Sequence, residues 1–215
     1  MDPSSTPPPR PLARLGLFGG SFDPVHQGHL GIAREAVRVA GLDELWFLPA
    51  AQPPHKPGRR LAPAEDRVAM LELALADEDG MRVRCDELER GGTSWTLDTV
   101  RALEGEAQEL WLLIGSDNLA GLPGWRGGEE ILERARPLVA LRDASAAREL
   151  EHAAARIGGD AGARLRGALM ALEPLPGAST RIREALARGE APADLCPAVA
   201  EFVRRRGLYG PAAAG

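Results

Sequence analysis

Lysine is almost missing from this chain of 215 residues, and positive charge is in short supply overall. Lys56 is the single lysine among 26 basic residues, and 31 acidic residues give a net charge of −5. Proteins that coat nucleic acid usually need a basic surface to hold the phosphate backbone, so this charge argues against a nucleic-acid partner. A small phosphorylated ligand needs only a local positive pocket and remains compatible with the composition.

Cysteine and long apolar runs are also scarce. Cys85 and Cys196 belong to no Cys-x-x-Cys pair and no Cys/His cluster, which favours reduced thiols in a cytoplasmic protein. No run reaches the ~18 apolar residues of a membrane-spanning helix, so we expect no membrane partner. Residues 1–11 (MDPSSTPPPRP) lack the apolar segment of a signal peptide. We expect them to form a disordered Pro-rich tail, followed by a single domain over residues 12–210.

Two common phosphate-binding motifs are absent as well. The chain contains neither the P-loop pattern GxxxxGK followed by Ser or Thr, nor a GxGxxG segment after its first predicted strand. It also shows no internal repeat and no clear linker between domains. Any phosphate site must therefore be built from other residues.

Short apolar runs alternate with amphipathic stretches along the chain. Strands are predicted at Leu15–Phe18, Leu45–Leu48, Met81–Cys85, Leu110–Ile114, Leu138–Leu141 and Leu169–Leu172. Helices are predicted at Leu30–Ala40, Ala64–Ala76, Leu97–Leu103, Glu129–Ala135, Ser145–Ile157, Ser179–Ala187 and Ala198–Arg206. This alternation predicts an α/β fold, a Rossmann-like doubly wound parallel sheet with C-terminal helices. The weakest pattern lies between Arg142 and Gly167, where large apolar residues are few.

The loops after the predicted strands hold the densest clusters of Gly, His, Ser and Thr. Ligands of open parallel sheets bind beyond the carboxyl ends of the strands, so these loops are the candidate site. The first loop reads GGSFDPVHQGH, and its two glycines let the backbone approach a ligand closely. His26 and His29 straddle the start of the next helix and share one face. Imidazole N–H groups and a helix N-terminus together favour a bound phosphate.

The histidine pair also has two plainer interpretations. Histidines at a helix start need no ligand at all, and a pair of them can ligate zinc. No third ligand lies near His26 and His29, however, and metal-binding pairs on a helix prefer i, i+4 spacing. We therefore predict no metal site in the protein.

Three more loop segments contain polar side chains with two interpretations each. Lys56, in PPHKPG, either contacts phosphate or is simply solvated. Asp117, in GSDN, either binds ribose hydroxyls or caps a helix. The run from Ser179 to Arg183 (STRIR) is an ordinary helix start, or a site where Ser179, Thr180 and Arg183 hold the β- and γ-phosphates of a nucleotide.

In their order and spacing, these segments resemble the HxGH nucleotidyltransferase superfamily. GSFDPVHQGH resembles its first signature, and STRIR resembles its second, usually written ISSTxIR, with Gly177 and Ala178 where Ile and Ser are usual. From about Leu15 to Tyr209 the chain resembles the bacterial nicotinate-nucleotide adenylyltransferases. Further marks are FLPAAQPPHKP, DELERGGTSWT, IGSDNLAGLPGW and DLCPAVAEFVRRRGLY. The resemblance makes residues 12–210 a nucleotidyltransferase domain.

The resemblance implies adenylyl transfer from ATP to nicotinate mononucleotide, giving nicotinate adenine dinucleotide (deamido-NAD) and pyrophosphate in NAD biosynthesis. Mg²⁺ would be carried in with ATP. The two substrates are the expected partners, and the sequence leaves a homo-oligomer open. The alternatives are a nicotinamide mononucleotide or phosphopantetheine adenylyltransferase, and a regulatory nucleotide-binding module without catalysis. Intact His26, His29 and Arg183 argue against that last alternative.

The resemblance also assigns roles to individual residues. The catalytic residues would be His26, His29 and Arg183. The ATP-binding residues would be Gly19, Gly20, Ser21, Phe22, Lys56, Asp117, Ser179, Thr180 and Arg183. The mononucleotide-binding residues would be His55, Thr96, Gly115, Asp117 and Trp125.

The nicotinate end of the site carries the sharpest of these expectations. Trp125 would stack on the nicotinate ring, while Thr96 and backbone N–H groups before Trp125 would meet its carboxylate. Arg126 stands where the family often has a second aromatic residue, and can add long-range attraction for that carboxylate. Leu141 stands beside Arg142 where paired arginines are common.

Overall fold

A parallel β-sheet is the framework of the described structure. The computed structural model describes residues 11–54, 61–140, 146–170 and 178–210. Its six strands follow the order β3-β2-β1-β4-β5-β6, and every neighbouring pair is parallel. The strands are β1 (Leu12–Gly20), β2 (Glu44–Pro49), β3 (Met81–Val83), β4 (Ala107–Gly115), β5 (Ala135–Ala140) and β6 (Leu169–Met170). The direction of winding reverses between β1 and β4, so these two strands flank the crevice where such sheets bind ligands.

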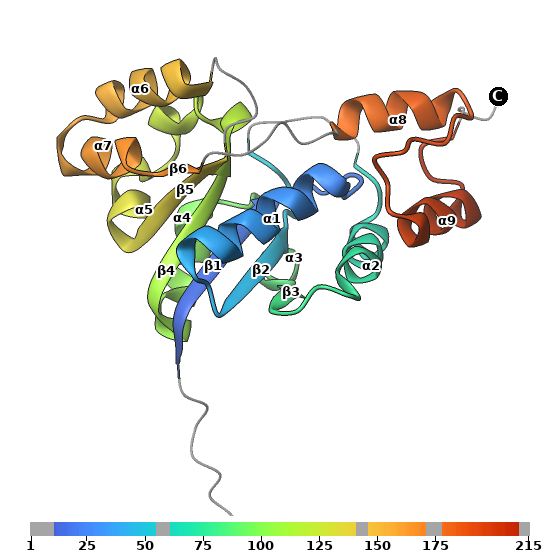
Figure 1. Cartoon of the computed structure of the whole chain (residues 1–215), viewed down its shortest axis with the longest axis horizontal. Coiled ribbons are helices and arrows are strands. Elements are labelled where there is room, and N and C mark those ends of the chain that lie inside the picture. Colours follow the sequence, from blue (N-terminus) through green and yellow to red (C-terminus); the bar gives the residue numbers. More distant parts are fainter. Residues whose placement is uncertain (1–10, 55–60, 141–145, 171–177, 211–215) are drawn as a thin grey trace, which may run out of the picture.

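Helices connect the strands and cover both faces of the sheet (Figure 1). The α-helices are α1 (Gln27–Ala40), α2 (Ala64–Leu75), α3 (Asp86–Arg90), α4 (Thr96–Leu103), α5 (Gly128–Arg134), α6 (Ala146–Ile157), α7 (Gly159–Arg166), α8 (Ser179–Ala187) and α9 (Pro197–Arg206). Short 3-10 turns are η1 (Glu104–Glu106), η2 (Ser116–Asn118) and η3 (Leu122–Gly124). Figure 1 shows α8 and α9 beside α2, at the opposite end of the molecule from α6 and α7. The predicted doubly wound sheet with C-terminal helices is therefore confirmed.

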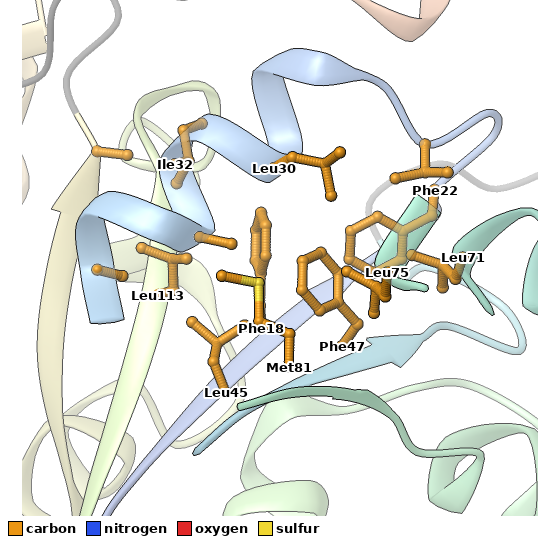
Figure 2. Close-up of a cluster of buried hydrophobic side chains, with 14 of the residues drawn as sticks. Phe18, Phe22, Leu30, Ile32, Leu45, Phe47, Leu71, Leu75, Met81 and Leu113 are labelled. Atoms are coloured by element: carbon orange, nitrogen blue, oxygen red, sulfur yellow. The ribbon is translucent and has the colours of Figure 1, made fainter. Parts of the chain in front are cut away.

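Two hydrophobic cores form, one against each face of the sheet, because successive strand side chains point to opposite faces. The α1-side core joins β1, β2 and β4 to helices α1, α2, α8 and α9 (Figure 2). Its members include Phe18, Phe22, Leu30, Phe47, Leu71, Leu113, Ile182 and Val199. The α4-side core joins the other face to α4, α5, α6 and α7. Its members include Leu17, Trp46, Leu97, Leu112, Leu122, Ile131, Leu150 and Leu165.

Several predicted element boundaries are wrong. The strand expected at Met81–Cys85 ends at Val83, because β3 is an edge strand that pairs only with β2 and α3 begins soon afterwards. The helix expected at Glu129–Ala135 ends at Arg134, since Ala135 already pairs with Leu110 as the first residue of β5. The strand expected at Leu15–Phe18 extends over the whole of Leu12–Gly20.

The stretch between Arg142 and Gly167 holds a helix, α7, that the sequence pattern did not predict. It packs against α6 through small residues, since a Cβ atom on Gly162 would collide with the carbonyl oxygen of Ala154. Close packing of this kind needs alanine and glycine in place of large apolar side chains, which is why the segment looked weak.

Some expectations concern residues outside the described part of the chain. These are the tail at residues 1–10, the end of the strand expected at Leu138–Leu141, and the end of that expected at Leu169–Leu172. Within the described ranges, no helix has both the length and the apolar character needed to cross a membrane.

The α1-side core yields a stability prediction at Phe47, whose side chain is fully buried between sheet and helices (Figure 2). Phe47→Ala is expected to lower the free energy of unfolding by about 3–5 kcal/mol, because it removes apolar contacts and leaves a cavity. Urea unfolding followed by circular dichroism measures this. Val39→Ala is the control, since Val39 is 48% exposed, and a change beyond about 0.5 kcal/mol is not expected there.

Candidate active site

A cavity of about 280 Å³ opens at the carboxyl ends of β1 and β4, where the winding of the sheet reverses. Residues from each of the four loops that the sequence pointed to line it, and residues at the start of α4 and on α3 join them. The predicted site residues among the lining are Gly19, Gly20, Ser21, Phe22, His26, His29, Thr96, Gly115, Asp117, Trp125, Ser179 and Thr180. Arg183 lies one helical turn behind, and His55 and Lys56 lie outside the described residues.

The two histidines stack at the start of α1. Their ring centroids are 3.8 Å apart and the rings are inclined by 33°. The backbone N–H of His26, the N-cap residue, donates to Nδ1 of His29 over 3.3 Å. Because that nitrogen accepts a hydrogen bond, the proton of neutral His29 belongs on Nε2, where it can be donated to a ligand. His26 is 2% exposed, so its imidazole is fixed within the cavity wall.

The loop between β1 and α1 uses its two glycines differently. A Cβ atom on Gly19 would meet nothing within 4 Å, so the space beside its backbone is open. A Cβ atom on Gly20 would approach the ring of Phe22 to 2.9 Å. That ring is buried edge-on against Phe18, at a centroid distance of 5.4 Å, and lies 5.2 Å from His29. Gly19 thus leaves room for a ligand, whereas Gly20 leaves room for the aromatic side chain that supports His29.

Helix α8 begins with the STRIR segment, and its hydrogen bonds hold that segment beside the loop between β1 and α1. The Ser179 hydroxyl donates to the carbonyl oxygen of Pro24 over 3.1 Å, and Arg183 Nη1 donates to the carbonyl oxygen of Asp23 over 2.6 Å. Arg183 Nη2 also donates to the Thr180 hydroxyl over 3.1 Å. These bonds place the N-terminus of α8 beside that of α1, so two partial positive charges face one cavity.

Three residues that support the first loop were not predicted as site residues. Arg67 on α2 is 2% exposed and donates to the carbonyl oxygens of Ser21, Ala50 and Ala62. Burial lowers the pKa of this guanidinium from its usual value. Asp23 and Tyr209 form a second such contact, in which the Tyr209 hydroxyl donates a hydrogen bond to Asp23 Oδ1. A lone arginine among helical residues, or a tyrosine near the C-terminus, carries no signal of such roles in the sequence.

The opposite wall of the cavity includes the start of α4 and the segment between η3 and α5. Thr96 is the first residue of α4, and Trp125 is the C-cap residue that follows η3. The backbone donors expected just before the tryptophan are already used, because the N–H groups of Gly124 and Trp125 donate to Gly121 and Leu122. The start of α4 is therefore the better source of donors at this wall.

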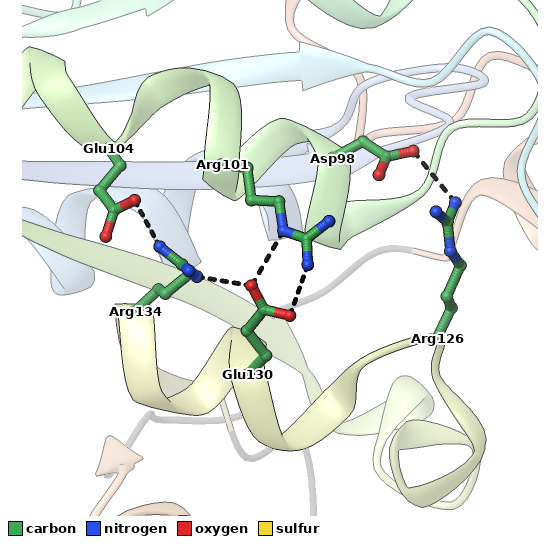
Figure 3. A network of polar contacts seen from close by, with 6 residues as sticks. All are labelled: Asp98, Arg101, Glu104, Arg126, Glu130 and Arg134. Atoms are coloured by element: carbon green, nitrogen blue, oxygen red, sulfur yellow. Dashed lines mark hydrogen bonds and ion pairs between the residues drawn. The ribbon is translucent and has the colours of Figure 1, made fainter.

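Arg126 is not a free cation, because a carboxylate pairs with it. Its guanidinium forms an ion pair with Asp98 over 3.2 Å and lies 5.7 Å from the ring centre of Trp95. Figure 3 shows this pair beside a second network between α4 and α5, formed by Arg101, Glu104, Glu130 and Arg134. The long-range attraction expected from Arg126 is thus largely offset by Asp98.

Two carboxylates also line the cavity. Asp117 is exposed just after β4. A Cβ atom on Gly115 would lie only 2.5 Å from Asp117 Oδ1, so the missing side chain of Gly115 makes room for this carboxylate. Glu87, which the sequence did not single out, is 5% exposed and accepts a hydrogen bond from the Thr99 hydroxyl over 2.8 Å. No group of three or more His, Cys, Asp or Glu side chains that could hold a metal ion occurs in the described ranges.

The sheet topology, the paired helix N-termini and the stacked histidines are the features of a nucleotidyltransferase site. The chain matches the cytidylyltransferase-like family over residues 17–185. A probable nicotinate-nucleotide adenylyltransferase of Gloeobacter violaceus is 43% identical over 91% of this chain and 96% of its own length. One of Bordetella avium is 38% identical over 94% and 100%. The chain therefore belongs to the nicotinate-nucleotide adenylyltransferase family.

Solved structures agree on the fold. A nicotinic acid mononucleotide adenylyltransferase of Plasmodium falciparum, solved in complex with NaAD, superposes with a TM-score of 0.69. The match covers 92% of this chain and 97% of that one at 15% sequence identity. The same arrangement of strands and helices is thus kept although most side chains differ.

The support of the first loop yields a prediction at Arg67. Lysine cannot reproduce the planar fork that reaches three carbonyl oxygens, so Arg67→Lys leaves at least one of them unsatisfied. We expect the free energy of unfolding to fall by about 1–3 kcal/mol in urea titrations. Arg38→Lys is the matched control, because Arg38 is exposed and its ion pair with Glu35 lies on the surface. Equal stability of the two variants would contradict the support assigned to Arg67.

Proposed function

We propose that this protein transfers the adenylyl group of ATP to nicotinate mononucleotide, giving nicotinate adenine dinucleotide and pyrophosphate. The observation that carries the proposal is the convergence of two helix N-termini and two stacked histidines on one cavity at the reversal of the sheet. That arrangement is suited to a polyanion whose charge shifts during reaction. Membership of the nicotinate-nucleotide adenylyltransferase family supports the choice of substrates.

The triphosphate would lie across the starts of α1 and α8. Gly19, with open space beside its backbone, lines the cavity together with His29 and Thr180. We assign His26 and His29 to the α-phosphate, where charge grows during transfer, and Ser179, Thr180 and Arg183 to the departing pyrophosphate. Arg183 donates to the Asp23 carbonyl oxygen and to the Thr180 hydroxyl, and these bonds hold its guanidinium at the start of α8.

The chemistry needs no covalent enzyme intermediate. A phosphate oxygen of the mononucleotide attacks the α-phosphorus of ATP, and the bond from that phosphorus to the bridging oxygen breaks. Pyrophosphate leaves with the electron pair. The protein aligns two anions and offsets the charge of the five-coordinate phosphorus, so positioning and fixed hydrogen-bond donors supply the acceleration.

Mg²⁺ would enter as part of the substrate Mg-ATP. The ion would be held mainly by triphosphate oxygens and water, as Mg²⁺ commonly is in nucleotide sites. Bound there, the ion neutralises part of the triphosphate charge. No protein ligand for it is assigned.

The nicotinate ring would bind against Trp125, with its carboxylate toward the start of α4. The Thr96 hydroxyl and the partial positive charge of that helix N-terminus both favour a carboxylate. An amide in the same place would turn its NH₂ group toward donors and leave it unpaired, which costs about 1–3 kcal/mol. We assign the ribose hydroxyls to Asp117.

Both cysteines are free thiols, which supports a site of action in the reducing cytoplasm.

Removal of one histidine tests the assigned transition-state contacts. His29→Ala or His26→Ala is expected to lower kcat by about 10²-fold or more, the effect of losing one fixed charge-stabilising donor. Pyrophosphate release from Mg-ATP and nicotinate mononucleotide is the measurement. His152→Ala is the matched control, since His152 is exposed on α6 away from the cavity. Near wild-type turnover in both site variants would remove the histidines from the mechanism.

Comparison of the acid and amide mononucleotides tests the other end of the site. The kcat/KM for nicotinate mononucleotide is expected to be at least tens of times that for nicotinamide mononucleotide, because polar mismatch rejects the amide. Thr96→Val should narrow this ratio by removing a donor. The double variant Asp98→Asn/Arg126→Gln should leave it nearly unchanged, because it removes two charges that offset each other. Trp125→Ala should weaken both substrates alike. Equal efficiency of wild-type protein on the two mononucleotides would favour a dual-specificity enzyme instead.

A further inference from the structure

A buried contact joins the C-terminal end of the described chain to the first loop of the site. The Tyr209 hydroxyl donates to Asp23 Oδ1 over 2.7 Å, across 186 residues of sequence. Asp23 is 1% exposed, and the same oxygen also accepts the backbone N–H of Ala62 over 3.1 Å. A carboxylate buried this deeply depends on each donor around it.

Asp23 also holds Arg183 by its backbone. Its carbonyl oxygen accepts Arg183 Nη1 over 2.6 Å, and its Oδ2 lies 3.9 Å from the same nitrogen. One residue therefore connects the phenol of Tyr209 to the arginine assigned to the pyrophosphate end of ATP. Asp23 also lines the cavity, so a change in its orientation is felt directly by the loop that carries His26.

The backbone of Tyr209 is itself held in an unfavourable conformation. Its φ of +60° lies in the left-handed region, which a bulky residue adopts only where surrounding contacts require it. The buried hydroxyl contact supplies such a requirement. Burial, and then the charge of Asp23, raise the pKa of Tyr209, so the phenol keeps its proton and acts as a donor.

The rest of the C-terminal segment is anchored separately. Arg206 forms an ion pair with Asp66 on α2 over 2.9 Å, and Val199 and Val203 of α9 lie in the α1-side core. The backbone N–H of Leu208 donates to the carbonyl oxygen of Val203 over 3.1 Å. Loss of the Tyr209 hydroxyl alone thus removes the contact with the site while leaving α9 attached.

We propose that Tyr209 is a positioning residue for ATP, acting through Asp23 on Arg183. The proposal rests on the ATP site proposed above. Tyr209 touches no substrate in this scheme. It keeps Asp23 oriented, and Asp23 keeps the guanidinium of Arg183 at the start of α8.

Steady-state kinetics of Tyr209→Phe test the proposal, because this variant removes one oxygen atom and keeps the ring. The KM for ATP is expected to rise about tenfold, the scale of losing a hydrogen bond to a charged group, with the KM for nicotinate mononucleotide unchanged. Arg206→Gln is the matched control: it loosens the same segment at another contact and should lower the melting temperature without changing the KM for ATP. Equal effects of Tyr209→Phe on both KM values, or none, would overturn the proposal.

A double-mutant cycle separates action through Arg183 from a general loss of order. In an Arg183→Ala background, Tyr209→Phe should change the KM for ATP by less than about twofold, because the residue through which it acts is gone. Independent, additive effects would overturn the path through Arg183. Absence of turnover in the wild-type protein would instead count against the proposed function, so the two failures are distinguishable.

Hydrogen exchange in the wild-type protein gives a second test that needs no variant. If the Tyr209 contact strengthens ATP binding, ATP binding must strengthen the contact by the same factor. Mg-ATP alone should therefore slow exchange of the Leu208 amide, and nicotinate mononucleotide alone should not. Unchanged exchange at Leu208 under saturating Mg-ATP would overturn the coupling.

Discussion

Two hydrogen bonds between distant segments hold the site together. They run from Ser179 to Pro24 and from Arg183 to Asp23, across 155 and 160 residues of sequence. Each bond ends on a backbone carbonyl of the loop before α1, so the second signature is attached to the first by its main chain. They hold the N-termini of α1 and α8 at the same cavity, so the partial positive charges of both helices act on one site.

The part of the site that the sequence predicted is the part that follows from strand ends. Once Leu110–Ile114 is seen as a buried strand and GGSFDPVHQGH follows the first strand, parallel topology brings Gly19, His29 and Gly115 to one edge. Trp125 and Thr96 were placed by resemblance, and the structure brings both to the same cavity. The stacking of the two imidazoles was foreseen only as a shared face.

The supporting residues could not be predicted in the same way, because their roles depend on tertiary contacts. Nothing in the local pattern around Arg67 says that its guanidinium will reach the nearby carbonyl of Ala62 and the carbonyls of Ser21 and Ala50 on two other segments. Asp98 likewise looks like an ordinary first-turn acid, yet it pairs with Arg126 and removes much of the attraction that the arginine promised. Helix α7 was missed for a related reason, since its packing relies on glycine and alanine.

The two halves of the site pack on different hydrophobic cores, which lie on opposite faces of the sheet. The loop before α1 and helix α8 rest on the α1-side core through Phe22 and Ile182, whereas the wall formed by α4 and η3 rests on the α4-side core through Leu97 and Leu122. A substitution that repacks one core leaves the other in place, because the strands lie between them. If the proposed roles hold, the wall that would choose the acceptor can diverge during evolution while the part that would bind ATP is inherited unchanged, and one ancestral fold can give rise to enzymes with different acceptors.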